Sequence, residues 1–520
     1  MPEKLHNNKR IAKNTLLLYI RMLFSMLISL YTSRVILQTL GVEDYGIYNV
    51  VGGVVTMFSI LSGSLSAAIS RFITYELGKG NIRNLTTIFS SAINIQAGLS
   101  LIIVLLAESI GLWFLNVKMN IPTDRMYASN WVYQLSILTF VLGLISVPYS
   151  AAIVAHEKMS AFAYIGIFET SAKLLVVYLL LLFTCDKLIL FAILMAIIAL
   201  IIRLIYGFYC KRHFEECHYT FSFNIEQFRE MFAFAGWSLV GNLGFSFKDQ
   251  LSNILLNLFF GTVVNAARGI SVQVGSLINS FSANFMMAMN PQITKSYAVG
   301  DLYRSKELVY AGCRFSFYLL AVISLPIMIN ITYILNLWLV EVPQYTDIFL
   351  ILTIVCNLLY AISSPLTTAM QATGRIKWFQ VIICIVMLTE LPIAYLLLSI
   401  GYPPYSVLYA SLFVTLLGVL IRIVLISRIL PIYEIRYYVT HIFSKNILIV
   451  FITYCIAYIL HKKMEQDSFF TAVLSSFILE LILFSLAYLC GLSSTERYVV
   501  NQKLVTILES KRRKNKQKNI

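Results

Sequence analysis

Long apolar runs separated by short polar breaks follow one another along nearly the whole chain. An α-helix rises 1.5 Å per residue, so about 20 apolar residues cross the roughly 30 Å of hydrocarbon in a bilayer. The pattern therefore predicts an all-α polytopic membrane protein with about 14 transmembrane helices. The spans cover approximately residues 14–38, 45–75, 87–115, 128–154, 161–184, 187–210, 231–258, 263–295, 307–339, 346–371, 376–399, 404–430, 440–460 and 469–490.

Polar residues inside the first span form a stripe. At 100° per residue, Arg21, Ser25, Ser29 and Thr32 lie within about 80° of one another on a helix. Arg34 falls on another side, near the outer end, where it can extend to lipid headgroups. Because a guanidinium inside a bilayer is costly, Arg21 is expected to face something other than lipid.

Similar stripes recur in three other spans. Their members are Ser238, Asn242, Ser246, Asp249 and Asn253 in span seven, Arg268, Gly275, Asn279, Ser282 and Asn290 in span eight, and Asn49, Gly52, Thr56, Ser59, Gly63 and Ser70 in span two. Close helix packing explains the glycines and serines. Charges at this depth usually face a cavity or a partner. The stripes therefore favour a water-filled lumen between spans one, two, seven and eight over structural ion pairs.

Several charges near these stripes form a separate set. Glu169 and Lys173 in span five are four residues apart, a spacing that allows an ion pair on one helical face. Asp249 lies in span seven and Glu390 in span eleven. We expect a structural or gating role for this set, with ion coupling, in particular proton coupling by Glu169 or Glu390, as the alternative.

The sequence contains an internal repeat. Residues 146–181 align without a gap with residues 363–398, which places Pro148 opposite Pro365 and Tyr178 opposite Tyr395. At nearly the same offset, Gly41 meets Gly261, Ser62 meets Ser282 and Gly80 meets Gly300. Six spans return the chain to the same side, so the two copies are parallel. Two such bundles can enclose a cavity and expose it alternately to each side, which favours a transporter.

The repeat also divides the chain. It predicts an N-terminal six-helix lobe at 1–210, a cytoplasmic inter-lobe loop at 211–230, and a C-terminal six-helix lobe at 231–430. Two additional transmembrane helices follow at 431–490, and a basic cytoplasmic tail at 491–520. Pro392 is expected to kink span eleven.

Composition and charge agree with this organisation. The chain is 59% hydrophobic and 12% charged, with a mean hydropathy of +0.78. Its formal charge of +15 comes mainly from loops and tail, where it suits membrane lipids and not nucleic acid. Cytoplasmic loops collect Lys and Arg, so both termini are expected to be cytoplasmic. The outer loops hold only Lys118, Arg125, Lys187, Lys462 and Lys463.

Neither a cleaved signal nor a metal site is predicted. The first span is too long for a signal peptide and lacks an Ala-x-Ala exit, so it is expected to be an uncleaved anchor. The eight cysteines include no Cys-x-x-Cys motif, which gives no support for a disulfide framework. The inner-loop residues Cys210, His213, Cys217 and His218 match no metal-site spacing and are interpreted as ordinary loop residues. No cofactor is expected.

Several motifs together resemble a known family. They are the arginine-bearing first span, the turn "LGVEDYGIYN" at 40–49, the serine-rich second span ending "SRFITYELGKGN", and the two parallel sets of six spans plus two. With these features the chain resembles the polysaccharide-transporter branch of the multidrug/oligosaccharidyl-lipid/polysaccharide (MOP) exporter superfamily, which includes Wzx-type O-antigen flippases. The resemblance implies a V-shaped, MATE-like arrangement of the two lobes with a cationic lumen.

The resemblance also implies a function. A flippase of this branch is not an enzyme; it moves a polyprenyl-pyrophosphate-linked oligosaccharide from the inner to the outer leaflet of the bacterial cytoplasmic membrane, for surface polysaccharide such as the O-antigen of lipopolysaccharide. The implied partners are this lipid-linked oligosaccharide, membrane lipids, H⁺ or Na⁺ as a coupling ion, and a polysaccharide polymerase with other assembly proteins.

A pyrophosphate inside a low-dielectric cavity needs compensating cations, and the fork of an arginine binds phosphate oxygens in pairs. Candidates for a cationic, substrate-binding lumen are Arg21, Arg268, Lys248, Arg71 and Arg314. Candidates for sugar-binding polar positions are Ser25, Ser29, Asn242, Ser246 and Asn279.

Two other functions are considered. A MATE-like, cation-coupled multidrug exporter handles organic cations and so calls for acidic residues in its lumen, whereas the stripes carry mainly basic ones. A membrane polysaccharide polymerase or ligase needs a substantial outer loop with catalytic groups, and the outer loops here are short. Direct use of ATP is disfavoured because no phosphate-binding Gly-rich loop with Lys-Ser/Thr is present.

Overall fold

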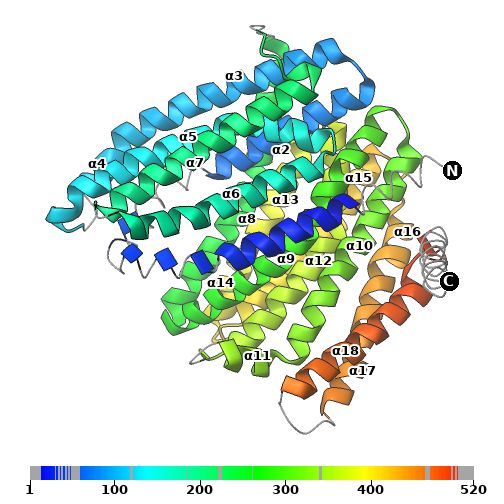
Figure 1. The fold of residues 1–520 in the computed structure, drawn as a ribbon. Helices are drawn as coiled ribbons and strands as arrows, with labels where there is room; N and C mark the ends of the chain where they lie inside the picture. Colours follow the sequence, from blue (N-terminus) through cyan, green and yellow to red (C-terminus); the bar gives the residue numbers. More distant parts are fainter. Residues whose placement is uncertain are drawn as a thin grey trace, which may run out of the picture.

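The computed structural model consists of helices, and no strand occurs among the residues it describes (Figure 1). The all-α prediction is confirmed. Some residues of the sequence prediction lie outside the described residues: Asn49, Gly52 and Thr56 of the span-two stripe, and Arg34, which was expected to extend to lipid headgroups. Residues 502–520 of the tail lie outside them as well. The described residues are 13–29, 31–32, 35–36, 39–40, 44, 47–48, 59–117, 121–183, 185–220, 225–260, 262–338, 342–462, 469–493, 496–497 and 501.

The N-terminal bundle begins with a helical segment at 13–29. It continues with α2 (Ser59–Lys79), α3 (Ile82–Leu106), η1 (Ala107–Gly111), α4 (Leu112–Val117), η2 (Thr123–Arg125), α5 (Met126–Ala155), α6 (Met159–Leu182), α7 (Lys187–His213) and η3 (Glu215–Cys217). The buried side chains of Ile69, Phe89 and Val177 belong to its core. This bundle occupies the upper part of Figure 1.

The C-terminal bundle lies below it. Its helices are α8 (Ile225–Phe260), α9 (Thr262–Ala298), α10 (Leu302–Ile329), α11 (Ile331–Trp338), α12 (Thr346–Thr373), α13 (Lys377–Leu388), α14 (Glu390–Ser399) and α15 (Ser406–Ile429). The side chains of Phe317, Ile362 and Ile423 belong to its core. Span eleven is interrupted between α13 and α14, as predicted, because Pro392 has no N–H to donate to the carbonyl of Leu388.

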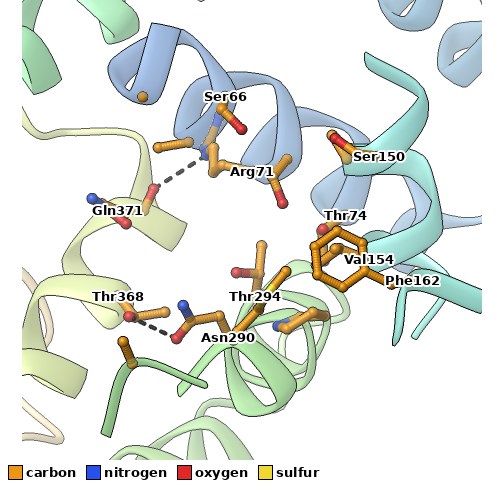
Figure 2. A pocket seen from close by; sticks show the side chains of 17 residues that line it. Ser66, Arg71, Thr74, Ser150, Val154, Phe162, Asn290, Thr294, Thr368 and Gln371 are labelled. Atoms are coloured by element: carbon orange, nitrogen blue, oxygen red, sulfur yellow. Dashed lines mark hydrogen bonds between the residues drawn. The ribbon is translucent and has the colours of Figure 1, made fainter. Parts of the chain in front are cut away.

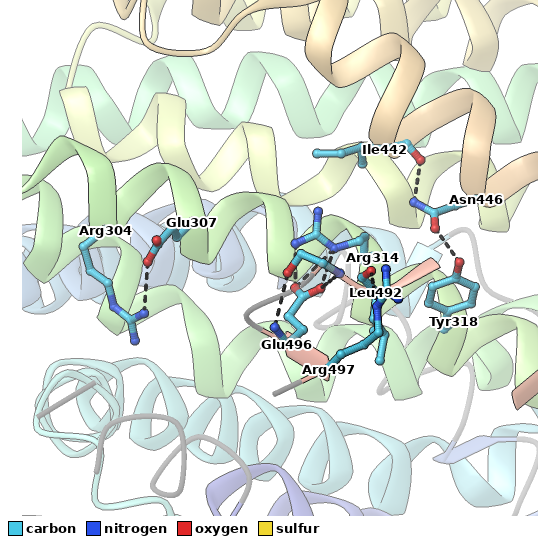
Figure 3. A network of polar contacts seen from close by, with 10 residues as sticks. Arg304, Glu307, Arg314, Tyr318, Ile442, Asn446, Leu492, Glu496 and Arg497 are labelled. Atoms are coloured by element: carbon cyan, nitrogen blue, oxygen red, sulfur yellow. Dashed lines mark hydrogen bonds and ion pairs between the residues drawn. The ribbon is translucent and has the colours of Figure 1, made fainter. Parts of the chain in front are cut away.

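A third group of helices is attached to α10. It comprises α16 (Ile435–Tyr437), η4 (Tyr438–Ser444), α17 (Lys445–Lys462), α18 (Phe469–Leu486) and η5 (Ala487–Gly491). Arg314 on α10 pairs with Glu496 beyond η5, with Nη2 2.5 Å from Oε1, and Tyr318 donates a hydrogen bond to Asn446 on α17 (Figure 3). The expectation that Arg314 faces the lumen is therefore corrected, because its guanidinium fastens the C-terminal helices to the bundle.

Ten of the described helical stretches are long and apolar enough to cross a membrane. They confirm a multi-pass membrane protein, while the number fourteen stays a prediction. The two longest helices, α8 and α9, are not among the ten. Both carry polar stripes, which lower their hydropathy.

The internal repeat corresponds to equivalent pairs of helices. Residues 146–181 form the end of α5 and most of α6, and residues 363–398 form the end of α12 with α13 and α14. Gly80 and Gly300, which follow the ends of α2 and α9, both have a left-handed backbone, with φ of 73° and 81°. The two six-helix sets therefore share local conformation as well as sequence.

The two bundles meet mainly along α2, which packs against α8 and α9. The segment 13–29 lies between the bundles and contacts both (Figure 1). On one side the Ser25 and Thr170 hydroxyls are 3.0 Å apart, and on the other the Tyr19 hydroxyl donates to the Phe281 carbonyl at 3.0 Å. This arrangement leaves a space between α2, α5, α9 and α12, which is described next.

Candidate functional site

A cavity of about 400 Å³ lies between the two bundles. This volume is within the range of pockets that hold small-molecule ligands. Helices α2, α5 and α6 wall it on one side, and α9 and α12 on the other (Figure 2). The sequence placed the lumen between spans one, two, seven and eight. Of these, spans two and eight, which are α2 and α9, supply the described wall residues of this cavity, and the described parts of spans one and seven supply none. Its other walls come from spans four, five and ten.

The wall residues of the two bundles are related by the repeat. Residues on α2 and α9 correspond at a spacing of 220, and residues on α5 and α12 at 217. The cavity therefore lies on the pseudo-two-fold axis between the bundles. The matched pairs are Gly63 with Ala283, Ala67 with Met287, Ser70 with Asn290, Arg71 with Pro291, Thr74 with Thr294, Ala151 with Thr368, and Val154 with Gln371.

Among the described residues of this wall, Arg71 alone is charged. Its Nε donates to the carbonyl of Gln371 and its Nη2 to that of Ala372, both at 3.2 Å, so it bridges the bundles at the carboxyl end of α12. That end carries the negative pole of the helix dipole, which favours a cation there. Aromatic rings surround the guanidinium, with Tyr75 at 5.0 Å and Phe234 at 5.4 Å.

The guanidinium of Arg71 retains capacity for an anion. No carboxylate in the described part of the chain lies within ion-pair distance of it, and its Nη1 has no hydrogen-bond partner there. Figure 2 shows Arg71 directed toward Gln371 across the space between α2 and α12. The position combines a positive charge with unused N–H donors.

The other polar residues of the wall are uncharged. On the side of the C-terminal bundle, the Thr368 hydroxyl donates to the Asn290 side chain at 3.0 Å (Figure 2). Hydroxyls and amides of this kind can donate and accept hydrogen bonds, as sugar hydroxyls require. The other polar wall residues are Ser66, Ser70, Thr74, Ser150, Thr294 and Gln371.

Arg21 lies next to the cavity and not in its wall. Its guanidinium carbon is 4.6 Å from the ring centre of Phe162, a wall residue on α6, and its stem packs on Gly166. Among the described residues, no carboxylate forms an ion pair with it. The polar stripe of the first span thus faces α6, where Ser25 meets Thr170.

Arg268 and Lys248 form a compact, charge-balanced cluster inside the C-terminal bundle. Lys248 Nζ is 3.1 Å from Glu390 Oε2 and 3.3 Å from Asp249 Oδ1, and Arg268 Nη2 is 3.8 Å from the same Asp249 oxygen. Ser252 donates to Glu390, which is fully buried at the start of α14. None of the four charged residues is in the cavity wall. Arg268 and Lys248 were predicted to bind substrate in the lumen, but in this cluster Asp249 and Glu390, for which a structural or gating role was expected, balance their two positive charges.

The span-five charges pair with each other, Lys173 Nζ lying 2.6 Å from Glu169 Oε1. Among the predicted sugar-binding positions, Asn242 crosses to the other bundle and donates to Ser64 at 3.0 Å. Ser29 and Ser246 are exposed and Asn279 is half-buried, all outside the cavity wall. Gly275 is pressed against Thr353 of α12, as the close-packing interpretation predicts.

Sequence reasoning missed the wall residues on α5, α6 and α12. They lie on mainly apolar helices whose charged residues, such as Glu169 and Lys173 on α6, are not in the wall, so hydropathy gives no signal for them. The internal repeat does give a signal for them, because it aligns Ala151 and Val154 on α5 with Thr368 and Gln371 on α12 and so identifies equivalent positions in the two bundles.

The inner-loop cysteines and histidines form no metal centre in the described part of the chain. Cys210 and Cys217 are buried, whereas His213 and His218 are exposed and bonded to backbone carbonyls of their own segment.

Comparison with known families identifies the protein family to which the chain is similar. The model of a family described as "Polysaccharide biosynthesis protein" matches residues 11–297, more than half of the chain. The MatE model matches residues 238–396. A curated relative, described as the uncharacterized membrane protein EpsK of Bacillus subtilis (strain 168), is 24% identical over 287 residues. The match covers 54% of this chain and 55% of EpsK, about half the length of that relative.

Solved structures share the fold. A MATE transporter from Vibrio cholerae superposes with a TM-score of 0.69 at 15% identity, over 84% of this chain and 100% of that one. A transporter of the MOP superfamily from Pyrococcus furiosus superposes with a TM-score of 0.66 at 12% identity, over 82% of this chain and 96% of that one. The chain therefore belongs to the polysaccharide biosynthesis protein family and is a membrane transporter of the MOP superfamily with a MATE-like fold.

Proposed function

We propose that this transporter is a flippase for a polyprenyl-pyrophosphate-linked oligosaccharide. It moves the headgroup from the inner to the outer leaflet of a bacterial cytoplasmic membrane, with both termini in the cytoplasm, for surface polysaccharide synthesis. The two bundles rock against each other, so the cavity opens to one side and then to the other.

The observation that carries the proposal is the chemistry of the cavity wall. Arg71 is the one charge in the described part of the wall, and the other polar residues there are hydroxyls and amides. Hydrogen bonds between arginine and phosphate are charge-assisted and roughly twice as strong as neutral ones. The pyrophosphate binds at Arg71 and the sugars bind along Thr74, Asn290 and Thr368, while the lipid tail stays in the membrane between the bundles.

Arg21 supplies a second cationic contact in this proposal. It stacks on Phe162, which borders the cavity, and no carboxylate of the described residues neutralises it. A small displacement of the segment 13–29 brings its guanidinium toward the headgroup. Arg268 and Lys248 have a structural role instead, since Asp249 and Glu390 already balance their charges.

The charged pairs also bear on energy coupling. We assign the Lys173–Glu169 and Lys248–Glu390 pairs to stabilising the open and closed bundles, in keeping with their short separations of 2.6 and 3.1 Å. Proton or sodium coupling through Glu169 or Glu390 is the competing assignment, and it predicts that a glutamine at that position uncouples transport from the ion gradient.

The MatE match at 238–396 favours one other candidate, a multidrug exporter. Organic cations need carboxylates or aromatic faces at their site. The described cavity wall has no carboxylate, and the ring of Phe162 in it already lies under the guanidinium of Arg21. The wall also carries Arg71, whose charge repels such a substrate. The wall therefore supports an anionic cargo.

Restoration of surface glycan tests the proposal. In cells that lack the gene, Arg71→Ala is expected to abolish surface glycan at normal membrane levels of the protein, and Arg71→Lys to restore part of it. Arg375→Ala is the matched control, because Arg375 is an exposed arginine just beyond the end of α12. Normal glycan in the Arg71→Ala cells, or drug resistance conferred by the wild-type chain without any glycan, would contradict the flippase.

A further inference from the structure

Glu157 joins three segments at one end of the molecule. One carboxylate oxygen is 3.0 Å from Lys295 Nζ on α9, and the other accepts a hydrogen bond from Gln292 at 2.5 Å. The backbone carbonyl of Glu157 accepts from Asn14 in the N-terminal segment at 3.2 Å. We call this group of four residues the latch. It links the turn between α5 and α6 in the N-terminal bundle to α9 in the C-terminal bundle.

The carboxylate of the latch is buried, whereas its lysine, Lys295, is 25% exposed. The Glu157 side chain is 1% exposed, and Gln292 and Asn14 are also buried. A buried carboxylate is stable only when it is paired and hydrogen-bonded, and Glu157 meets both conditions through residues of the opposite bundle. Its environment thus depends on the two bundles staying together at this end.

The backbone of Glu157 shows that its side chain has a specific use. Helix α5 ends with Lys158 N–H bonded to the Ile153 carbonyl at 3.0 Å, a motif whose left-handed position usually holds glycine. Glu157 occupies that position with φ of 59°. The repeat places Gly374 there in the other copy, with φ of 77°. A residue that strains the backbone where glycine fits is typical of functional sites.

The latch exists in only one of the two equivalent places. At the spacing of 220, Gln292 and Lys295 correspond to Phe72 and Tyr75, whose rings lie over Arg71. The place next to Glu157 therefore holds an ion pair between the bundles, and the equivalent place next to Gly374 holds Arg71, the proposed anion-binding arginine.

The latch borders the cavity. Neighbouring residues of α9 contribute to the cavity and to the latch. Pro291 and Thr294 line the cavity, and the residues that follow each of them, Gln292 and Lys295, bind Glu157. Val154 and Phe162, on either side of the α5–α6 turn, are wall residues as well. At the same end, a side chain on Gly78 of α2 would lie 2.9 Å from the Ala298 side chain. The bundles are thus in close contact beyond the latch.

We propose that the latch is the gate that closes the cavity at the end formed by the carboxyl termini of α2, α5 and α9. While the bundles touch, the Glu157 carboxylate stays out of water and its pair with Lys295 holds this end shut. When they rock apart, water reaches the Glu157 carboxylate and replaces its contact with Lys295. The proposal rests on the fold and holds for any cargo.

Access to a cavity cysteine measures the state of this gate. Ser66→Cys places a thiol on the α2 wall, and a membrane-impermeant maleimide is applied to vesicles of either orientation, with the parent chain as background. Labelling from the latch side is expected to be slow in the reporter alone. Glu157→Gln and Lys295→Met should each accelerate it roughly tenfold, which corresponds to a shift of about 1.4 kcal/mol in the closed–open equilibrium.

Three further variants make the test specific. Glu157→Gly removes the carboxylate and relieves the backbone, so fast labelling in this variant cannot arise from misfolding of the turn. The charge exchange Glu157→Lys with Lys295→Glu should restore slow labelling. Glu76→Gln removes a pair with Lys79 within α2 at the same end, 3.7 Å apart, and should leave labelling unchanged. Parental labelling rates in both Glu157→Gln and Glu157→Gly, or an exchange variant as fast as the single ones, would overturn the proposal.

Discussion

Glu157 and Gly374 occupy the same place in the two copies of the repeat, and both have a left-handed backbone, with φ of 59° and 77°. A left-handed conformation costs about 1–2 kcal/mol for a residue with a side chain, and almost nothing for glycine. The two copies use this one backbone position differently. Glu157 bonds to the opposite bundle, whereas Gly374 leaves room for the Arg71 side chain.

Gly374→Ala is expected to lower both stability and transport. The new Cβ would lie 2.7 Å from Arg71 Nη2, so the guanidinium must leave the carbonyls of α12. Gly300→Ala is the matched control, because Gly300 has φ of 81° and open space around it. Thermal unfolding should show that the left-handed backbone alone lowers the free energy of unfolding by a similar amount, about 1 kcal/mol, in each variant. Glycan export should fall only in Gly374→Ala, and equal export in both variants would contradict the role of Arg71.

Arg314→Ala should detach the C-terminal helices from α10. Arg314 and Glu496 have side chains only 9% and 12% exposed, and removing one partner of a buried pair costs about 3–5 kcal/mol. Limited proteolysis should then cleave after η5 far faster than in the wild type. Glu307→Ala breaks a pair on the same helix whose carboxylate is 53% exposed, and should change stability by less than about 1 kcal/mol (Figure 3). Unchanged cleavage in Arg314→Ala would show that the pair does not hold these helices.

Glu216 is expected to make stability depend on pH. Burial, the largest single influence, acts to raise the pKa of Glu216. The hydrogen bond with His156, at 2.5 Å, a backbone hydrogen bond and the charge of His156 together outweigh burial and bring the pKa below the ordinary 4.5. A carboxyl whose pKa is depressed by folding stabilises the folded state above about pH 4.5, and this contribution disappears as the pH falls through the folded-state pKa.

Thermal unfolding between pH 7 and pH 3 checks this sign. The wild type should unfold at a higher temperature than Glu216→Gln at pH 7, and the difference should shrink below pH 4.5. Glu215→Gln, at an exposed neighbouring position, should match the wild type throughout. A difference that grows toward acid pH would contradict the assignment.

Arg21→Ala should slow transport without removing the protein from the membrane. A hydrogen bond to a charged group contributes about 1.5–3 kcal/mol, so the loss of one headgroup contact corresponds to a reduction of about tenfold or more. Arg21→Lys keeps the charge and should retain part of the activity. Surface glycan at the wild-type level in Arg21→Ala would restrict the headgroup site to Arg71.

The sequence predicts the fold well because hydropathy and repetition are global signals. Apolar runs give the membrane-crossing helices, and Pro392 gives the break in span eleven. The match of Pro148 with Pro365 gives the equivalence of α5 and α12. Each of these follows from backbone chemistry or from the bilayer, and needs no knowledge of side-chain neighbours.

The site is harder to predict, because a helical wheel tells which residues share a face and not what that face meets. Arg21, Arg268 and Arg314 were all assigned to the lumen. In the structure, Arg21 lies against Phe162, and Arg314 pairs with Glu496. Arg268 contacts Thr353 and Asp249. Long side chains find local partners within each bundle. Arg71 reaches the cavity because the carboxyl end of α12 from the other bundle holds it there.

Binding of a polyprenyl pyrophosphate to the purified protein in lipid nanodiscs tests the central claim most directly. Loss of charge-assisted hydrogen bonds worth about 1.5–3 kcal/mol should weaken binding to Arg71→Ala by about tenfold or more. Arg71→Lys should bind with intermediate affinity, since a lysine acts as a point charge without the fork, and Arg375→Ala should bind as the wild type does. Equal affinity of the wild type and Arg71→Ala for this lipid would contradict the claim that the cavity holds an anionic headgroup at Arg71.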